Sequence, residues 1–256
     1  MSGAVTDTSA GPAPRFLAAG DAALVIEYGE VIDAPLIAAV QRLDCALAAA
    51  CLPGVTETVP SFRSLMVHYD PLATSRAVLI DAIQRLDPGA SDEPATPAGQ
   101  AWSLPVCYED QFAPDLADVA AATGLAPDRV IATHAATAFS VAVVGFLPGC
   151  PFMAELPAAF NLPRRTAPRT RVPAGSVAVA QKLSVIYPTE SPGGWHLIGN
   201  CPVPLFDARW ETPALLAPAD RVRLRPIAAA EHGRILAAAR GGDYDPRREC
   251  RDGARA

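Results

Sequence analysis

The residues best suited to hold an anion lie in one positively charged stretch of an acidic chain. Between Glu155 and Glu190 the sequence has no other acidic residue, but it has four arginines and Lys182, the chain's only lysine. A guanidinium group matches the paired oxygens of a carboxylate or phosphate. We therefore predict that Arg164, Arg169 and Lys182 hold such a group. Pairing with acidic residues elsewhere in the fold is the alternative.

Three turns rich in glycine and proline lie in or beside this stretch. They span residues 145–152, 172–176 and 187–195. Glycine lets the backbone approach a ligand closely, and proline stiffens the loop around it. Backbone N–H groups in 145–152 and 191–195 are therefore predicted to stabilise a developing oxyanion. Ordinary tight turns between strands would explain the same composition.

Few side chains in the sequence suit acid–base or nucleophilic chemistry. His134 lies late in a predicted helix and precedes a strand, and we take it as the candidate for proton transfer, with a structural role as the alternative. Cys150 could act as a nucleophile, but no histidine is adjacent in sequence to activate it. Ser176 and Ser191 lack the GxSxG context of a hydrolase serine. No metal site is expected, because no Cys/His cluster has zinc-ligand spacing.

Composition excludes several other classes of function. The chain has 256 residues, half of them hydrophobic, and a net charge of −6. That charge argues against a nucleic-acid partner. Residues 116–131 resemble a helix-turn-helix, but the second helix offers only Arg129 to a phosphate backbone. No apolar run reaches the roughly 20 residues of a membrane span, and no secretory signal is visible. A cytoplasmic protein without a membrane partner is expected.

The patterning predicts an α+β fold with two domains. A strand near 22–28, a helix over 35–50, a strand within 55–69 and a helix over 76–86 form a small α/β domain. A second domain begins with a strand at 102–108 and two helices, and then continues as short strands typical of a β-barrel or sandwich. The predicted limits are a tail at 1–14, the first domain at 15–87, a linker at 88–101, the second domain with its terminal helix at 102–240, and a disordered tail at 241–256.

Ordered motifs along most of the chain resemble one known family. They include Gly20-Asp21-x-Ala-Leu24, Gly54-Val55-x-Glu57-x-Val59-Pro60, Ser64-Leu65-x-Val67-x-Tyr69-Asp70-Pro71, Gly145-Phe146-x-Pro148-Gly149, Val172-Pro173-Ala174-Gly175-Ser176 and Ser191-Pro192-Gly193-Gly194-Trp195. Together they resemble the family of KipI and the 5-oxoprolinase B subunit, also called allophanate hydrolase subunit 1. The resemblance covers about residues 16–228.

The resemblance implies both a fold and an activity. It implies a small α/β domain followed by a cyclophilin-like β-barrel. It implies ATP-dependent opening of 5-oxoproline to glutamate, with a homologous KipA-like barrel of the C type and a third, A-type subunit as partners. Related modules form the carboxyltransferase part of biotin-dependent urea carboxylase, so biotin is a further possible cofactor. The alternative is a regulatory module, because some members are named for inhibiting a histidine kinase.

Motif position and residue type together mark the suspected site. His134 and Arg169 are taken as catalytic, with Phe152 and Trp195 as apolar walls for a small anionic or amide substrate. The expected substrate-binding residues are Phe146, Pro148, Gly149, Phe152, Arg164, Gly175, Ser176, Lys182, Tyr187, Ser191, Gly193, Gly194 and Trp195.

Three segments of this site depart from the family pattern. Residues 150–154 read CPFMA where the family usually has Phe-x-Tyr-Leu-Gly. Residues 181–185 read QKLSV, which lacks two glycines and a glutamine of the usual pattern. Residues 198–202 read IGNCP in place of Ile-Gly-Arg-Thr-Pro. Because these changes fall in the suspected site while the scaffold motifs remain, the substrate is left open.

Overall fold

The computed structural model of the chain describes residues 14–86 and 99–252. The chain divides into two compact units between Pro97 and Ala98, and each unit is described by itself. The predicted tail falls on residues 1–13 and most of the predicted linker on residues 87–98, both outside the described residues.

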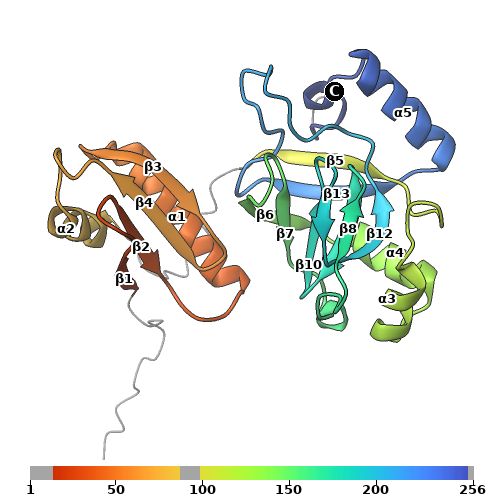
Figure 1. The fold of residues 1–256 in the computed structure, drawn as a ribbon, viewed down its shortest axis with the longest axis horizontal. Helices are drawn as coiled ribbons and strands as arrows, with labels where there is room; N and C mark the ends of the chain where they lie inside the picture. The colour runs from red at the N-terminus through yellow and green to blue at the C-terminus, as the bar shows by residue number, and fades with distance from the viewer. Residues whose placement is uncertain (1–13, 87–98, 253–256) are drawn as a thin grey trace, which may run out of the picture. The chain divides into compact units, whose positions relative to one another are not determined.

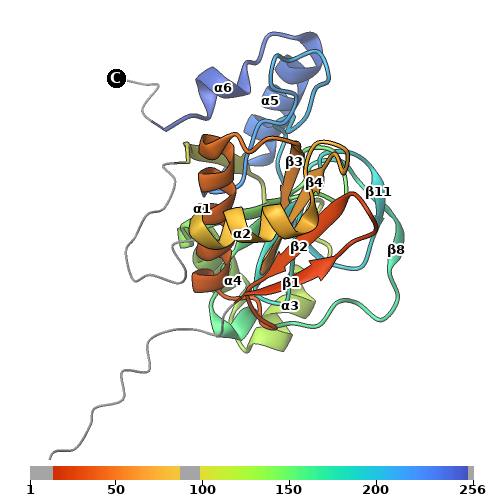
Figure 2. The same ribbon diagram turned by 90° about the vertical axis from the view of Figure 1, so that its left-hand side faces the viewer.

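The N-terminal unit is a four-stranded antiparallel sheet covered by two helices. Its elements are β1 (Arg15–Ala18), β2 (Ala23–Glu27), α1 (Ala34–Ala50), β3 (Val55–Pro60), β4 (Ser64–Tyr69) and α2 (Arg76–Leu86), with strand order β1-β2-β4-β3. Alternate strand residues such as Leu24 and Val67 face Leu43 of α1 and Ile83 of α2 in one apolar core. Figure 2 shows α1 and α2 on the same face of this sheet. Asp33 caps α1 by accepting a hydrogen bond from the backbone N–H of Leu36.

The C-terminal unit is built on a seven-stranded, curled sheet. Its strands are β5 (Ala101–Val106), β6 (Phe139–Val144), β7 (Pro151–Ala154), β9 (Ser176–Ala180), β10 (Leu183–Ile186), β12 (His196–Asn200) and β13 (Arg221–Pro226), in the order β12-β9-β10-β7-β6-β13-β5. Within this sheet β13 and β5 pair in parallel, and the other neighbours pair antiparallel. The two outer strands are joined by a bridge in which Cys107 and Asn200 exchange backbone hydrogen bonds of 2.9 Å each way. The sheet therefore bends into a partly closed barrel.

Helices and a small ribbon cover this sheet. The helices are α3 (Leu116–Thr123), α4 (Pro127–Ala136), the 3₁₀ turn η1 (Ala158–Phe160), α5 (Ala229–Gly241) and α6 (Pro246–Glu249), and the ribbon pairs β8 (Arg169–Val172) with β11 (Ser191–Gly193). Figure 1 shows α5 and the α3–α4 pair on separate sides of the curled sheet. Helix α4 buries Val130 and His134, so the helix-turn-helix-like stretch packs its second helix on the core.

The prediction of a disordered tail at 241–256 is wrong for the part that the structure describes. Helix α5 runs to Gly241, α6 follows, and Cys250 is 2% exposed. The backbone N–H of Ser103 donates to the Cys250 carbonyl at 2.7 Å, and that of Asp252 donates to the Ala101 carbonyl at 2.8 Å. The segment is ordered because it pairs with the free edge of β5, which its charged composition does not reveal. Residues 253–256 lie outside the described residues.

The described residues contain neither a membrane-spanning helix nor a metal cluster. Within residues 14–86 and 99–252, no helix is long and apolar enough to cross a membrane. The same part of the chain holds no group of three or more His, Cys, Asp and Glu side chains that could bind a metal ion.

Candidate functional site

Many of the sequence-predicted binding residues meet in one cavity of about 430 Å³, here called the aromatic pocket. It forms where the 145–152 turn, strand β10 and the loop after β11 converge. Its lining residues are Phe146, Cys150, Phe152, Arg164, Pro168, Val185, Tyr187, Pro192, Gly193, Gly194 and Trp195. Seven of them belong to the predicted substrate-binding set, namely Phe146, Phe152, Arg164, Tyr187, Gly193, Gly194 and Trp195. Residues of the 145–152 and 191–195 loops thus line the same cavity.

Aromatic rings and one guanidinium form the walls of the aromatic pocket. The Phe152 and Trp195 rings meet edge to face, with centroids 5.8 Å apart at 75°. The Arg164 guanidinium carbon lies 5.7 Å from the Trp195 ring centroid. A ring face attracts a cation, so this contact orients the side chain without neutralising its charge. Among the described residues Arg164 has no carboxylate partner, and its charge remains available to an anion.

Phe146 stands at the mouth of this pocket in an unusual conformation. Its φ is +68° and the residue is 69% exposed. The turn that holds it is closed by the Gly145 N–H donating to the Cys150 carbonyl at 3.0 Å. A positive φ is costly for an aromatic residue, and such strain concentrates at ligand-contacting positions. Pro148 is exposed, whereas Gly149 (φ +74°) lets the turn pack against Phe206; neither lines the pocket.

The titratable groups Cys150 and Tyr187 of the pocket stay neutral near pH 7. Burial raises the pKa of the Cys150 thiol to about 12, so it lacks the thiolate that a nucleophile needs. Burial likewise raises the pKa of Tyr187 to about 12, and its hydroxyl remains a hydrogen-bond donor. The pocket therefore offers one cation, one neutral hydroxyl and apolar rings.

Gly193 sets the position of Tyr187 in the pocket. A Cβ on Gly193 would lie 2.5 Å from the Tyr187 hydroxyl and 3.0 Å from Val172, whereas one on the neighbouring Gly194 would meet nothing closer than 3.7 Å. We expect Gly193→Ala to lower the free energy of unfolding by about 1–3 kcal/mol through overpacking. The matched variant Gly194→Ala should change it by less than about 0.5 kcal/mol. Urea unfolding followed by tryptophan fluorescence measures both, and equal effects would refute this role.

Most of the cations between Glu155 and Glu190 are paired with acidic residues, which is the alternative to anion binding stated for this stretch. Asp115, 2% exposed, accepts two hydrogen bonds from Arg169 (2.7 and 2.9 Å), one from Arg165 (3.0 Å) and one from the Leu197 N–H (2.7 Å). Burial favours a higher pKa for Asp115, but the hydrogen bonds from Arg169 and Leu197 and both arginine charges outweigh it and hold the pKa below its usual value.

The two remaining cations of the stretch are also paired. Arg171 binds Glu190 through two hydrogen bonds of 2.7 and 3.0 Å. Lys182, in the turn between β9 and β10, pairs with Glu155. It lines neither the aromatic pocket nor the larger cavity described below. The expectation that Lys182 and Arg169 hold the anion in this pocket is corrected accordingly. Acidic residues distant in sequence already pair with both side chains.

His134 lies in the core and does not reach the aromatic pocket. It is fully buried, its Nδ1 is 2.8 Å from the Tyr108 hydroxyl, and its Nε2 is 2.9 Å from the Ser184 hydroxyl. Burial lowers the pKa of His134 to about 3, so the ring stays neutral. Without access to a cavity it cannot exchange a proton with a substrate. The expectation that His134 is catalytic is therefore corrected: its contacts are those of a structural residue.

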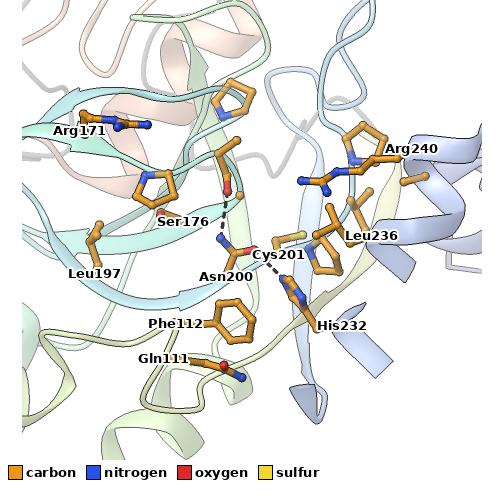
Figure 3. Close-up of a pocket in the computed structure, with 18 of the residues that line it drawn as sticks. Gln111, Phe112, Arg171, Ser176, Leu197, Asn200, Cys201, His232, Leu236 and Arg240 are labelled. Atoms are coloured by element: carbon orange, nitrogen blue, oxygen red, sulfur yellow. Dashed lines mark hydrogen bonds between the residues drawn. The ribbon is translucent and has the colours of Figure 1, made fainter. Parts of the chain in front are cut away.

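A second and larger cavity, of about 640 Å³, lies between the sheet and helix α5 and is here called the α5 cavity (Figure 3). It receives three of the sequence-predicted residues, Arg169, Gly175 and Ser176. Ser191 lines neither cavity, and its hydroxyl donates to the Pro192 carbonyl. Sequence reasoning missed His232 and Arg240 of this cavity, because the terminal helix that carries them has no motif.

The departures from the family pattern fall on both cavities. Cys150, Phe152 and Val185 line the aromatic pocket, and Asn200 and Cys201 line the α5 cavity. The altered residues at 150, 152 and 185 therefore lie at the candidate site. Residues 181–182 instead form the turn between β9 and β10, where both have a positive φ.

A family model and two related proteins place this chain in the same family. The model of the carboxyltransferase domain, subdomain C and D, matches residues 14–216. The chain is 34% identical to the 5-oxoprolinase B subunit from Bacillus subtilis, over 83% of this chain and 92% of that protein. It is 36% identical to the 5-oxoprolinase B subunit from Escherichia coli O157:H7, over 81% of this chain and 93% of that protein.

A solved structure supports the fold. The Kluyveromyces lactis urea carboxylase superposes with a TM-score of 0.73 at 19% identity, covering 91% of this chain and 23% of that one. At that identity the match bears on the fold alone. With the family match and the two relatives, it follows that this chain belongs to the family of KipI and the 5-oxoprolinase B subunit, built on carboxyltransferase subdomains C and D.

Proposed function

We propose that this chain is the substrate-binding subunit of an ATP-dependent system that opens a small cyclic amide, with 5-oxoproline as the first candidate. The observation that carries the proposal is Arg164 held over Trp195 in the aromatic pocket with no carboxylate partner among the described residues. The two similar proteins from Bacillus subtilis and Escherichia coli, both 5-oxoprolinase B subunits, make this substrate class the first to test.

The pocket suits a ring that carries both a carboxylate and an amide. The Arg164 guanidinium would bind the carboxylate, since two parallel N–H donors match its oxygens. Phe152 and Trp195 would pack on the apolar ring carbons. The neutral Tyr187 hydroxyl would donate to the amide oxygen, where negative charge grows during attack on the carbonyl carbon.

The described residues do not fit ATP by themselves. The sequence has no GxxxxGK[ST] or GxGxxG loop, and the part of the chain that the structure describes has no carboxylate cluster for a magnesium ion. We therefore place ATP binding on the proposed partners, the KipA-like C-type barrel and the A-type subunit. Biotin stays an expectation from the carboxyltransferase resemblance, and no residue here is assigned to it.

Turnover by the assembled complex tests this proposal. We expect the chain co-expressed with its C-type and A-type partners to convert 5-oxoproline with release of ADP and phosphate. Arg164→Gln should lower that turnover about 10- to 100-fold, since losing a charged hydrogen bond costs about 1.5–3 kcal/mol. The matched control Arg129→Gln, on the exposed face of α4, should retain wild-type turnover.

The outcomes separate the proposal from its rivals. An assembled complex that turns over neither 5-oxoproline nor urea-like amides would refute it. Turnover that is equally fast with Arg164→Gln would refute the role of Arg164. A chain that fails to bind the KipA-like partner but inhibits a histidine kinase would favour the regulatory alternative.

A further inference from the structure

The α5 cavity is a preformed concave site distinct from the aromatic pocket. Its 640 Å³ lies within the range typical of small-molecule sites. The loop 173–176 and the segment 200–204 form one wall, and helix α5 forms the other (Figure 3). Of the residues lining the two cavities, none is shared.

Hydrogen bonds around Asn200 fix the floor of this cavity. The Asn200 amide donates to the Ala174 carbonyl at 3.0 Å, and its oxygen accepts from His232 Nε2 at 2.7 Å. A Cβ on Gly175 would lie 2.4 Å from the Cys201 carbonyl oxygen and 2.7 Å from the Asn200 side chain. Only glycine at position 175 therefore lets the loop pack this closely on Asn200. Hydrogen bonds and close packing thus hold this wall of the cavity in place.

The charge of the lining is one-sided in an otherwise acidic protein. Three arginines and no acidic residue line the α5 cavity, although the chain carries a net charge of −6. Asp115 pairs with Arg169, and Glu190 pairs with Arg171. Arg240 has no carboxylate partner within residues 14–86 and 99–252. In Figure 3, Arg171 and Arg240 extend toward the cavity from opposite walls.

The rest of the lining is apolar or neutral. Phe112 packs against the His232 ring with centroids 4.3 Å apart. The His232 Nε2–H donates to the Asn200 oxygen. Burial lowers the pKa of His232, which favours the neutral ring near pH 7. Leu197, Leu236 and several prolines complete the surface. A ligand here would bury apolar area along the walls and place a negative group at the rim.

We propose that the α5 cavity is a second ligand site, for a small carboxylate with an apolar body, whose carboxylate binds Arg240 at the rim. The apolar body lies against Phe112 and Leu236. This site is independent of the proposed cyclic-amide site, so either proposal can fail while the other holds.

Fluorescence of anilinonaphthalene sulfonate, an apolar anion, tests the site in the full chain. We expect saturable probe binding at the α5 cavity, displaced by benzoate and hexanoate but not by benzyl alcohol or hexanol. Arg240→Glu should raise the dissociation constant about tenfold or more, since it reverses the rim charge. Arg234→Glu, the same change at an exposed position on the same helix, should leave it unchanged.

Filling the cavity gives a second, geometric test. Ala239→Trp should abolish probe binding because Ala239 lines the cavity, whereas Ala237→Trp, exposed on the same helix, should not. If circular dichroism shows that Ala239→Trp does not fold, the comparison of Arg240→Glu with Arg234→Glu tests the proposal by itself. Absence of saturable binding, equal weakening by Arg234→Glu and Arg240→Glu, or displacement by the alcohols as strong as by the acids would overturn the proposal.

Discussion

Replacing Asp115 by asparagine is expected to lower the free energy of unfolding of the C-terminal unit by about 2–4 kcal/mol. The carboxylate joins the start of α3 to β12, to Arg165 and to Arg169 at the start of β8. The change leaves two arginines without their counter-charge. The expected loss is below that of a fully buried pair because the arginine side chains keep 28% and 27% of their surface exposed.

Urea unfolding followed by tryptophan fluorescence measures this effect selectively. All three tryptophans, Trp102, Trp195 and Trp210, lie in the C-terminal unit. The control is Glu190→Gln, which breaks the exposed pair with Arg171 and should cost less than about 1 kcal/mol. A loss for Asp115→Asn no larger than that of the control would show that the Asp115 cluster is not a structural anchor.

Acid should destabilise the C-terminal unit through His134. Its folded pKa of about 3 lies below the ordinary value of 6.5, so the unfolded chain takes up the proton first as the pH falls. Stability is therefore complete above pH 6.5 and falls by about 1.4 kcal/mol per unit between 6.5 and roughly 3. At pH 4.5 the loss from this residue alone is about 2–3 kcal/mol. The pKa of His232 is also lowered by burial and adds in the same direction.

Comparing unfolding free energies at pH 7 and pH 4.5 isolates this contribution. His134→Gln should be less stable than wild type by about 2–3 kcal/mol at pH 7, because it breaks the contacts to Tyr108 and Ser184. It should then lose about 2–3 kcal/mol less than wild type on acidification. His68→Gln, in the N-terminal unit, should keep the wild-type slope. An unchanged slope in His134→Gln would contradict a buried, neutral ring.

The turns that form the aromatic pocket could be predicted because their local composition is distinctive. Residues 145–152 and 191–195 combine glycine, proline and aromatic residues, and such loops often present backbone and rings to a ligand. The sequence pattern does not show which of the two cavities each nearby residue lines. Tyr187 lines this pocket, whereas Gly175 and Ser176 line the α5 cavity, although all three were expected together.

The anion-binding role of the arginines could be predicted only in part. The lack of acidic residues between Glu155 and Glu190 is a local fact, but the partner of Arg165 and Arg169 is Asp115, 50 and 54 positions earlier in the chain. Only the packing of α3 against β12 brings that carboxylate to the loop. Arg164 does not pair with Asp115, but nothing in the sequence distinguishes it from Arg165, which does.

His134 and the C-terminal segment show a different limit. A lone histidine on a helix can face a cavity or the core, and the rotation of α4 against the sheet decides between them. The terminal segment looks disordered because charged residues dominate it. It is ordered because Tyr244 and Cys250 reach the core and its backbone adds to the β5 edge, both of which are tertiary effects.

The most direct test of the central claim is a nuclear magnetic resonance titration of the tryptophan indole N–H groups with 5-oxoproline. Trp195 lines the aromatic pocket, Trp102 donates to Asp220 at 2.8 Å in the core, and Trp210 packs against Arg247. We predict that the Trp195 signal, assigned with Trp195→Phe, shifts saturably while the other two stay in place. Arg164→Gln should abolish that shift. No shift of Trp195, or an equal shift in Arg164→Gln, would contradict the account.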